Sequence, residues 1–129
     1  MQKLVIVSII LFIAVALFLY AQQSAIPKDF DSITAEEVKK KIENKEDLLL
    51  LDVRTPGEFN GPLGHLEGAI LIPDFSLADS VGKLEKYKGK EVIVYCRSGN
   101  RSQNATRIML ANGYKAVNML GGMKAWNKL

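Results

Sequence analysis

Residues 91–102 read EVIVYCRSGNRS, and this stretch indicates the fold of the chain. Glu91 to Tyr95 is a short apolar run of the kind that forms a buried parallel strand. Cys96 follows the run directly, and small and charged polar residues then lead to a helix that begins at about Ser102. The stretch therefore predicts a strand, a tight polar loop and a helix N-terminus in succession.

Strands and helices alternate on both sides of this stretch. Thr34 and Glu37 form a capping box that starts a helix running to about Asn44, and Thr55 with Pro56 repeats the pattern for one short turn. The other expected elements are strands over 48–53, 69–72 and 116–119, helices over 77–87 and 102–112, and a short final helix. Such alternation predicts an α/β fold with a parallel central sheet and helices on both faces.

The apolar residues are unevenly distributed along the 129 residues. Residues 4–21 carry no charge, and as a helix they would extend about 27 Å, close to the roughly 30 Å hydrocarbon core of a bilayer. We therefore expect 1–21 to be a signal peptide or a transmembrane anchor, 22–28 a linker, and 29–129 one globular domain. A buried core helix is the alternative for the first segment.

Charge near the N-terminus predicts which side of the membrane the domain occupies. Lys3 and the amino group precede the apolar run, which favours a cytoplasmic N-terminus. Leu19-Tyr20-Ala21 matches the A-x-A cleavage site of signal peptides only in part, and the apolar run at residues 4–21 is long for a signal peptide. We therefore favour an anchor. Both interpretations predict export, to the periplasm or the outer face of the cytoplasmic membrane.

Composition argues against several classes of site. Cys96 is the only cysteine and His65 the only histidine, so an internal disulfide is impossible and a metal site is not expected. The net charge is +3 and the lysines are scattered, whereas nucleic-acid-binding proteins concentrate their basic residues. We expect no metal, no cofactor and no nucleic-acid partner.

Cys96 stands where a nucleophile can be activated. Small residues such as Gly99 let the loop amides point inward as a nest for an anion. The helix N-terminus, Arg97 and Arg101 add positive charge, and such surroundings lower the pKa of a thiol. We predict a catalytic thiolate at Cys96; a buried core cysteine is the alternative.

Several segments resemble the rhodanese family. CRSGNRS at 96–102 resembles its active-site loop, DVRTPGEF at 52–59 its DVR-x-x-x-E-[FY] segment, and GHLEGA at 64–69 its G-H-I-x-G-A turn. Gly113-Tyr114 and LGGMKAW at 120–126 resemble its C-terminal signatures. The resemblance covers about residues 30–128 in the family's order and leaves the apolar N-terminus outside.

The resemblance implies a rhodanese-like fold and sulfurtransferase chemistry. Cys96 would take the sulfane sulfur of thiosulfate or a persulfide, hold it as a persulfide, and pass it to a thiol or to cyanide. The substrate-binding residues would be Arg97, Ser98, Gly99, Asn100, Arg101 and Ser102. Arg101 has a second possible role, which is to pin the loop through a carboxylate.

Four residues outside the loop are expected to support it. Asp52 is expected to accept hydrogen bonds that hold the catalytic loop. Arg54 is expected either to reach substrate or to pair with a carboxylate such as Glu58. His65 is expected to satisfy backbone groups of its turn, because a preformed thiolate needs no general base.

Other functions stay open on the sequence alone. One alternative is a non-enzymatic module of the same fold that binds sulfur species or a protein at the membrane. A phosphatase or arsenate reductase is disfavoured, because those enzymes use His-Cys-x5-Arg, whereas Tyr95 precedes Cys96 and Arg101 follows it after four residues. The expected partners are a small sulfur donor, a thiol acceptor and, through residues 4–21, a membrane; the sequence does not identify a protein partner.

Overall fold

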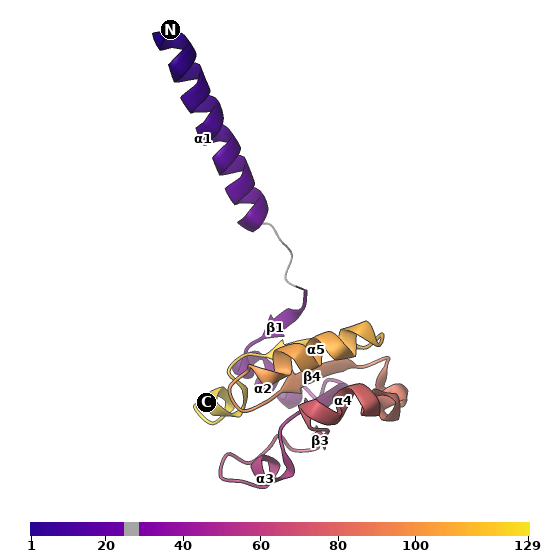
Figure 1. Cartoon of the computed structure of the whole chain (residues 1–129). Coiled ribbons are helices and arrows are strands. Elements are labelled where there is room, and N and C mark those ends of the chain that lie inside the picture. The colour runs from indigo at the N-terminus through magenta and orange to yellow at the C-terminus, as the bar shows by residue number, and fades with distance from the viewer. Residues whose placement is uncertain (25–28) are drawn as a thin grey trace.

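The structure is a computed structural model that describes residues 1–24 and 29–129, with side chains described for 1–20 and 29–129. Its elements in chain order are α1 (Gln2–Ser24), β1 (Asp31–Ile33), α2 (Ala35–Glu43), β2 (Leu48–Asp52), α3 (Pro56–Phe59), β3 (Ile70–Leu71), α4 (Asp74–Ser80), the 3-10 helix η1 (Val81–Tyr87), β4 (Glu91–Tyr95), α5 (Arg101–Ala111), β5 (Lys115–Met119) and α6 (Gly122–Trp126) (Figure 1). The order confirms an α/β fold behind one N-terminal apolar helix.

The five strands form one parallel sheet in the order β1-β5-β4-β2-β3. The central strand β4 pairs with β2 over its whole length, from Leu48 opposite Glu91 to Asp52 opposite Tyr95. Because parallel strands end at the same edge, the residues after Asp52 and after Tyr95 are brought together there. This edge carries the candidate site.

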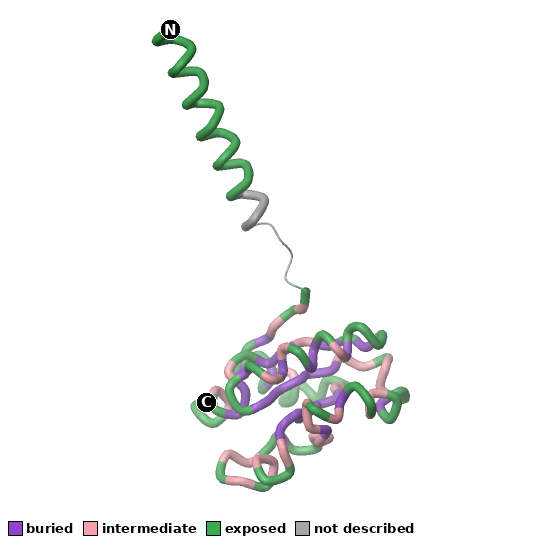
Figure 2. Tube along the Cα trace, viewed as in Figure 1, coloured by how far each residue is buried: buried purple, intermediate pink, exposed green. Residues whose placement is uncertain are grey.

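The two faces of the sheet form separate cores, as the predicted layers require. Along β4, Val92 and Val94 pack with buried residues of α4, η1 and α5, and Cys96 continues that face. Ile93 and Tyr95 point the other way and pack with residues of α2 and α6. Figure 2 shows the buried residues running through the middle of the domain. The alternation of side chains along a strand therefore places Cys96 on the α5 face.

The structure differs from the sequence-based prediction in two elements: one strand was not predicted, and one helix has other bounds. No strand is predicted before residue 48, yet β1 pairs with β5, Asp31 lying opposite Val117. The helix expected over 77–87 begins earlier, at Asp74, and residues 81–87 form a 3-10 helix. The early start follows from Asp74, whose backbone N–H donates to the Val53 carbonyl at 2.9 Å and anchors the chain as it leaves β3.

The N-terminal helix α1 lies apart from the domain (Figure 1). It is long and apolar enough to cross a membrane, with a mean hydropathy of 2.7 over Gln2–Tyr20, and none of that window is buried. The core-helix alternative is therefore wrong. The helix continues to Ser24, so residues 22–24 are helical where a linker is expected, and residues 25–28 lie outside the described residues.

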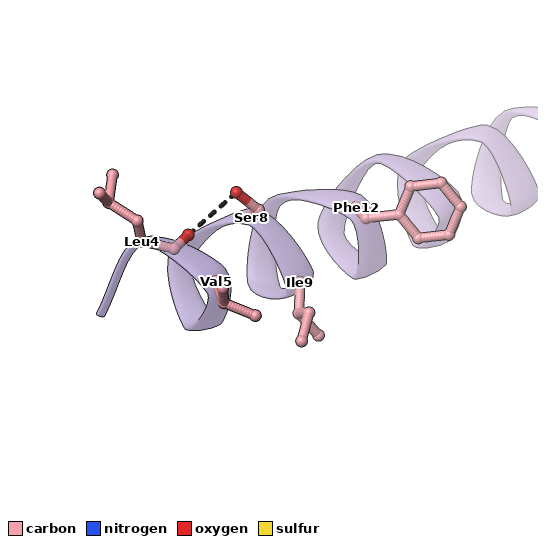
Figure 3. Close-up of a pocket in the computed structure, with 5 residues that line it drawn as sticks. All are labelled: Leu4, Val5, Ser8, Ile9 and Phe12. Atoms are coloured by element: carbon pink, nitrogen blue, oxygen red, sulfur yellow. Dashed lines mark hydrogen bonds between the residues drawn. The ribbon is translucent and has the colours of Figure 1, made fainter. Parts of the chain in front are cut away.

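Ser8 is the one serine within the apolar run of α1. Its Oγ donates to the Leu4 carbonyl at 2.9 Å, while Val5, Ile9 and Phe12 present apolar side chains beside it (Figure 3). The hydroxyl is thus satisfied within the helix. A polar group satisfied in this way is compatible with a hydrocarbon environment.

Candidate active site

The candidate site is built around the Cys96 thiol. Cys96 is the first residue after β4, and its side chain is only 1% exposed. The chain curls over the sulfur so that the Gly99 N–H donates to Sγ at 3.1 Å, and the Ser102 hydroxyl lies 3.3 Å from the same atom. This turn uses a φ of 99° at Gly99, in the region that favours glycine. The loop thus forms a cup of donors around one sulfur.

The hydrogen-bond donors around Sγ lower the pKa of the Cys96 thiol. Burial alone raises the pKa of Cys96, because a thiolate is poorly solvated inside the protein. The Ser102 hydroxyl and the amides of Ser102, Gly99 and Ser98 outweigh burial, and together they hold the pKa of Cys96 below its usual value. Hydrogen bonds therefore favour the thiolate form of Cys96.

Helix α6 supports the loop through its backbone. The Met123 N–H donates to the Cys96 carbonyl at 2.9 Å, and the Lys124 N–H donates to the Arg97 carbonyl at 3.0 Å. Gly122 has a φ of 54°, and a Cβ at this position would collide with the Cys96 carbonyl and the Arg97 backbone. The second glycine of the GG pair is therefore a steric requirement of the Cys96 loop.

Arg101 is held by Glu58 in a bidentate ion pair. Its two terminal nitrogens donate to the two Glu58 oxygens at 2.7 Å each. The hydrogen bonds from Arg101 lower the pKa of Glu58 to about 2, so the carboxylate stays ionised. Of the two roles open to Arg101, this geometry favours pinning the loop to α3, with its charge compensated.

Arg54 is buried against Asp52, not against Glu58. Asp52 is 0% and Arg54 1% exposed; Arg54 donates to Asp52 through Nε at 3.0 Å and through a terminal nitrogen at 2.7 Å. Arg54 also donates to the Glu58 carbonyl at 3.3 Å and the Gly64 carbonyl at 2.7 Å. Asp52 accepts hydrogen bonds as predicted, but within the described residues those that hold Arg54 tie down the segment after β2, not the loop after Cys96. The pair instead ties the 58–64 segment to β2.

The turn at residues 64–69 is tied to the sheet by a contact that the sequence did not predict. The Tyr95 hydroxyl accepts the Leu66 N–H at 3.1 Å. In the same turn, His65 is exposed, stacks on Phe59 with ring centroids 3.5 Å apart, and donates through Nδ1 to the Phe59 carbonyl at 2.8 Å. The stacking and the hydrogen bond of His65 stabilise the turn at residues 64–69.

The remaining loop residues face outward. Arg97, Ser98 and Asn100 are exposed, and Asn100 precedes α5 without a side-chain capping bond. A cavity of about 230 Å³ opens beside the loop, lined by Arg54, Glu58, Pro62, Leu63 and Arg97. Pro62 and Leu63 give this lining apolar surface, Arg54 and Arg97 give it cationic groups, and Glu58 gives it a carboxylate.

Comparison with known proteins agrees with this geometry. The profile of the rhodanese-like domain matches residues 34–129. The chain is similar to the putative sulfurtransferase YtwF of Bacillus subtilis, with 36% identity over 98 residues that cover 76% of this chain and 91% of the relative. It is similar to a putative mitochondrial thiosulfate sulfurtransferase of Schizosaccharomyces pombe, with 32% identity over 108 residues and 76% of each chain covered.

A solved structure of a rhodanese-like domain protein is also similar to this chain. The rhodanese-like domain protein from Staphylococcus aureus is similar with a TM-score of 0.68 and 34% identity, covering 75% of this chain and 91% of that one. These relatives support sulfur transfer as the general chemistry. The matched profile spans strands β2 to β5, the Cys96 loop and α6, and the chain belongs to the rhodanese-like domain family.

Proposed function

We propose that the protein is a sulfurtransferase that carries a sulfane sulfur on Cys96 and takes it from thiosulfate or a persulfide. The observation that carries the proposal is the hydrogen-bonded Sγ of Cys96, with the Gly99 N–H at 3.1 Å and the Ser102 hydroxyl at 3.3 Å. These donors stabilise a thiolate before substrate arrives, so no general base is required.

The first step loads the enzyme. The Cys96 thiolate attacks the outer sulfur of thiosulfate, a new S–S bond forms, and the bond between the two thiosulfate sulfurs breaks with its electron pair leaving on sulfite. The persulfide anion carries one negative charge and sulfite carries two, which balances the thiolate and the thiosulfate dianion. The loop amides then face the persulfide in place of the thiolate.

The second step unloads the enzyme. An acceptor thiolate attacks the outer sulfur of the persulfide, the acceptor becomes a persulfide, and the electron pair of the broken S–S bond returns to Cys96 as thiolate. Cyanide replaces the thiol in the same displacement and leaves as thiocyanate. The two half-reactions share one covalent intermediate, so the kinetics are ping-pong.

Thiosulfate is supported as a donor by two observations. The relative from Schizosaccharomyces pombe is named a putative thiosulfate sulfurtransferase. In this chain the exposed Arg97 and the adjoining cavity offer positive charge beside the thiol, where the sulfonate of thiosulfate would lie.

Mass spectrometry of the full chain tests this function. After treatment with thiosulfate, Cys96 is expected to gain one sulfur, about 32 Da, with release of sulfite. The Cys96→Ser variant should gain nothing, and treatment with sulfate is the matched chemical control. An unmodified wild-type Cys96 with no sulfite release would refute sulfur transfer from thiosulfate; binding of thiosulfate without either change would favour a non-enzymatic module.

We further propose that α1 anchors the domain at the outer face of the membrane. The 23-residue helix is about 34 Å long, enough to cross a hydrocarbon core of about 30 Å. Its apolar side chains are exposed, and Lys3 with the amino terminus precedes the run, which favours a cytoplasmic N-terminus.

Fractionation of cells that express the full chain tests the anchor. The intact chain is expected to stay with the membrane after alkaline carbonate extraction, with its domain accessible to protease added outside spheroplasts. A soluble periplasmic chain shortened by about 21 residues would contradict the anchor and favour a cleaved signal peptide. A domain protected from external protease would contradict export.

A further inference from the structure

The positive charges next to Cys96 fall into two groups. Arg54 is neutralised by Asp52, with 2.7 Å between the charged atoms, and Arg101 is neutralised by Glu58 at the same distance. These two ion pairs hold the architecture of the site and leave little net charge for a substrate.

The second group consists of Arg97 and Lys124. Both side chains are exposed, and neither has a carboxylate partner within the part of the chain that the structure describes. They come from different elements but meet at the backbone, because the Lys124 N–H donates to the Arg97 carbonyl at 3.0 Å. The preceding α6 residue, Met123, donates to the Cys96 carbonyl at 2.9 Å. The backbone of Lys124 is therefore one hydrogen bond away from Arg97, the residue that follows the nucleophile in the chain.

We infer that Lys124 acts with Arg97 as a charge pair that selects doubly charged sulfur donors for Cys96. The inference rests on the proposed sulfur transfer and adds a specificity-determining residue from α6. A dianion approaching a thiolate is repelled, and two uncompensated cations on residues that adjoin the loop would offset that repulsion. The offset is larger for a dianion than for a monoanion, because the Coulomb energy scales with the charge of the donor.

An exposed cation far from Cys96 is not expected to select between the two classes of donor. At physiological salt, exposed charges are screened beyond about 8 Å. Lys83 is also exposed and without an ion-pair partner in the described residues, but it belongs to η1. The Val81 carbonyl of η1 accepts the hydroxyl of Tyr114, the residue just before β5, which places η1 at the amino ends of the strands. Lys83→Glu therefore makes the same charge change as Lys124→Glu at the opposite edge of the sheet.

The experiment compares two donors on the full chain with cyanide as the common acceptor. Thiosulfate is a dianion that releases sulfite, and methanethiosulfonate is a monoanion that releases methanesulfinate. For Lys124→Glu, kcat/KM for thiosulfate is expected to fall roughly three- to ten-fold, and clearly less for methanethiosulfonate. Lys83→Glu should leave both values unchanged. Added salt should lower kcat/KM for thiosulfate more in the wild type than in Lys124→Glu.

The outcomes separate the inference from the function on which it rests. An unchanged thiosulfate-to-methanethiosulfonate ratio in Lys124→Glu, or an equal loss for both donors, would overturn the role of Lys124 while sulfur transfer stands. An equal ratio change in Lys83→Glu would also overturn it, because the effect would then be one of net charge. A wild-type protein inactive with both donors would overturn the function and the inference together.

Discussion

Replacing Asp52 with alanine is expected to lower the free energy of unfolding by about 3–5 kcal/mol, because the change leaves a buried cation without its partner. Arg54 is 1% exposed, and the carboxylate of Asp52 is what compensates its charge. Water cannot replace the carboxylate at that depth. Chemical denaturation of the full chain, followed by far-UV circular dichroism, measures the loss.

Two controls test the cause of this loss. Glu85→Ala breaks the exposed pair between Glu85 and Lys88, whose side chains are 68% and 42% exposed, and should cost at most about 0.5 kcal/mol. The double variant Asp52→Leu with Arg54→Met removes both charges and should recover much of the stability. If Asp52→Ala costs no more than Glu85→Ala, the buried ion pair is not what holds the 58–64 segment.

Replacing Ser102 with alanine is expected to slow the alkylation of Cys96 by iodoacetamide roughly ten-fold at neutral pH, since a hydrogen bond to a charged group contributes about 1.5–3 kcal/mol. The hydroxyl favours the thiolate, so its loss raises the pKa of Cys96 toward that of an ordinary thiol. The alkylation profile should therefore move to higher pH, and the deficit should shrink as the solution becomes alkaline. Rates measured between neutral and alkaline pH test the direction.

Ser98→Ala is the matched control for this prediction. Ser98 is exposed and acts on the Cys96 thiol through its backbone amide, which alanine keeps. Its profile should match that of the wild type. An equal shift in both variants would show that loop disorder, and not the lost Ser102 hydroxyl, is the cause; no shift in Ser102→Ala would remove that hydroxyl from the activation of the thiol.

Local features of the structure were predictable from the sequence. Thr34 caps α2 as its spacing with Glu37 predicts, the hydroxyl accepting the Glu37 N–H at 3.1 Å. The strand at Glu91–Tyr95 has the predicted bounds. These features depend on residues within one turn or one strand of each other, so short-range chemistry is sufficient.

The partners in the ion pairs could not be predicted without the tertiary fold. Arg54 has two carboxylates nearby in sequence, Asp52 and Glu58, and only the burial of Asp52 at the end of β2 decides between them. Glu58 then pairs with Arg101 on α5, a choice that depends on how β2 and β4 lie side by side. Residue types allow either pairing, so sequence alone left the question open.

Strand β1 was missed for a related reason. Asp31, Ser32 and Ile33 form only three residues with one apolar side chain, which is too short for a pattern of alternation. The strand forms because β5 offers it unpaired backbone groups along its free edge. Its existence is thus a property of the assembled sheet.

The pairing of β1 with β5 also has a consequence for the order in which the thiol site is assembled during synthesis. Asp31 lies opposite Val117, and Gly122 and Met123, which support the Cys96 loop, follow shortly after β5. Contacts between such distant parts of a chain form late, because the loop-closure entropy must be overcome first. The nascent chain therefore lacks an assembled thiol site until residues 117–123 have emerged from the ribosome.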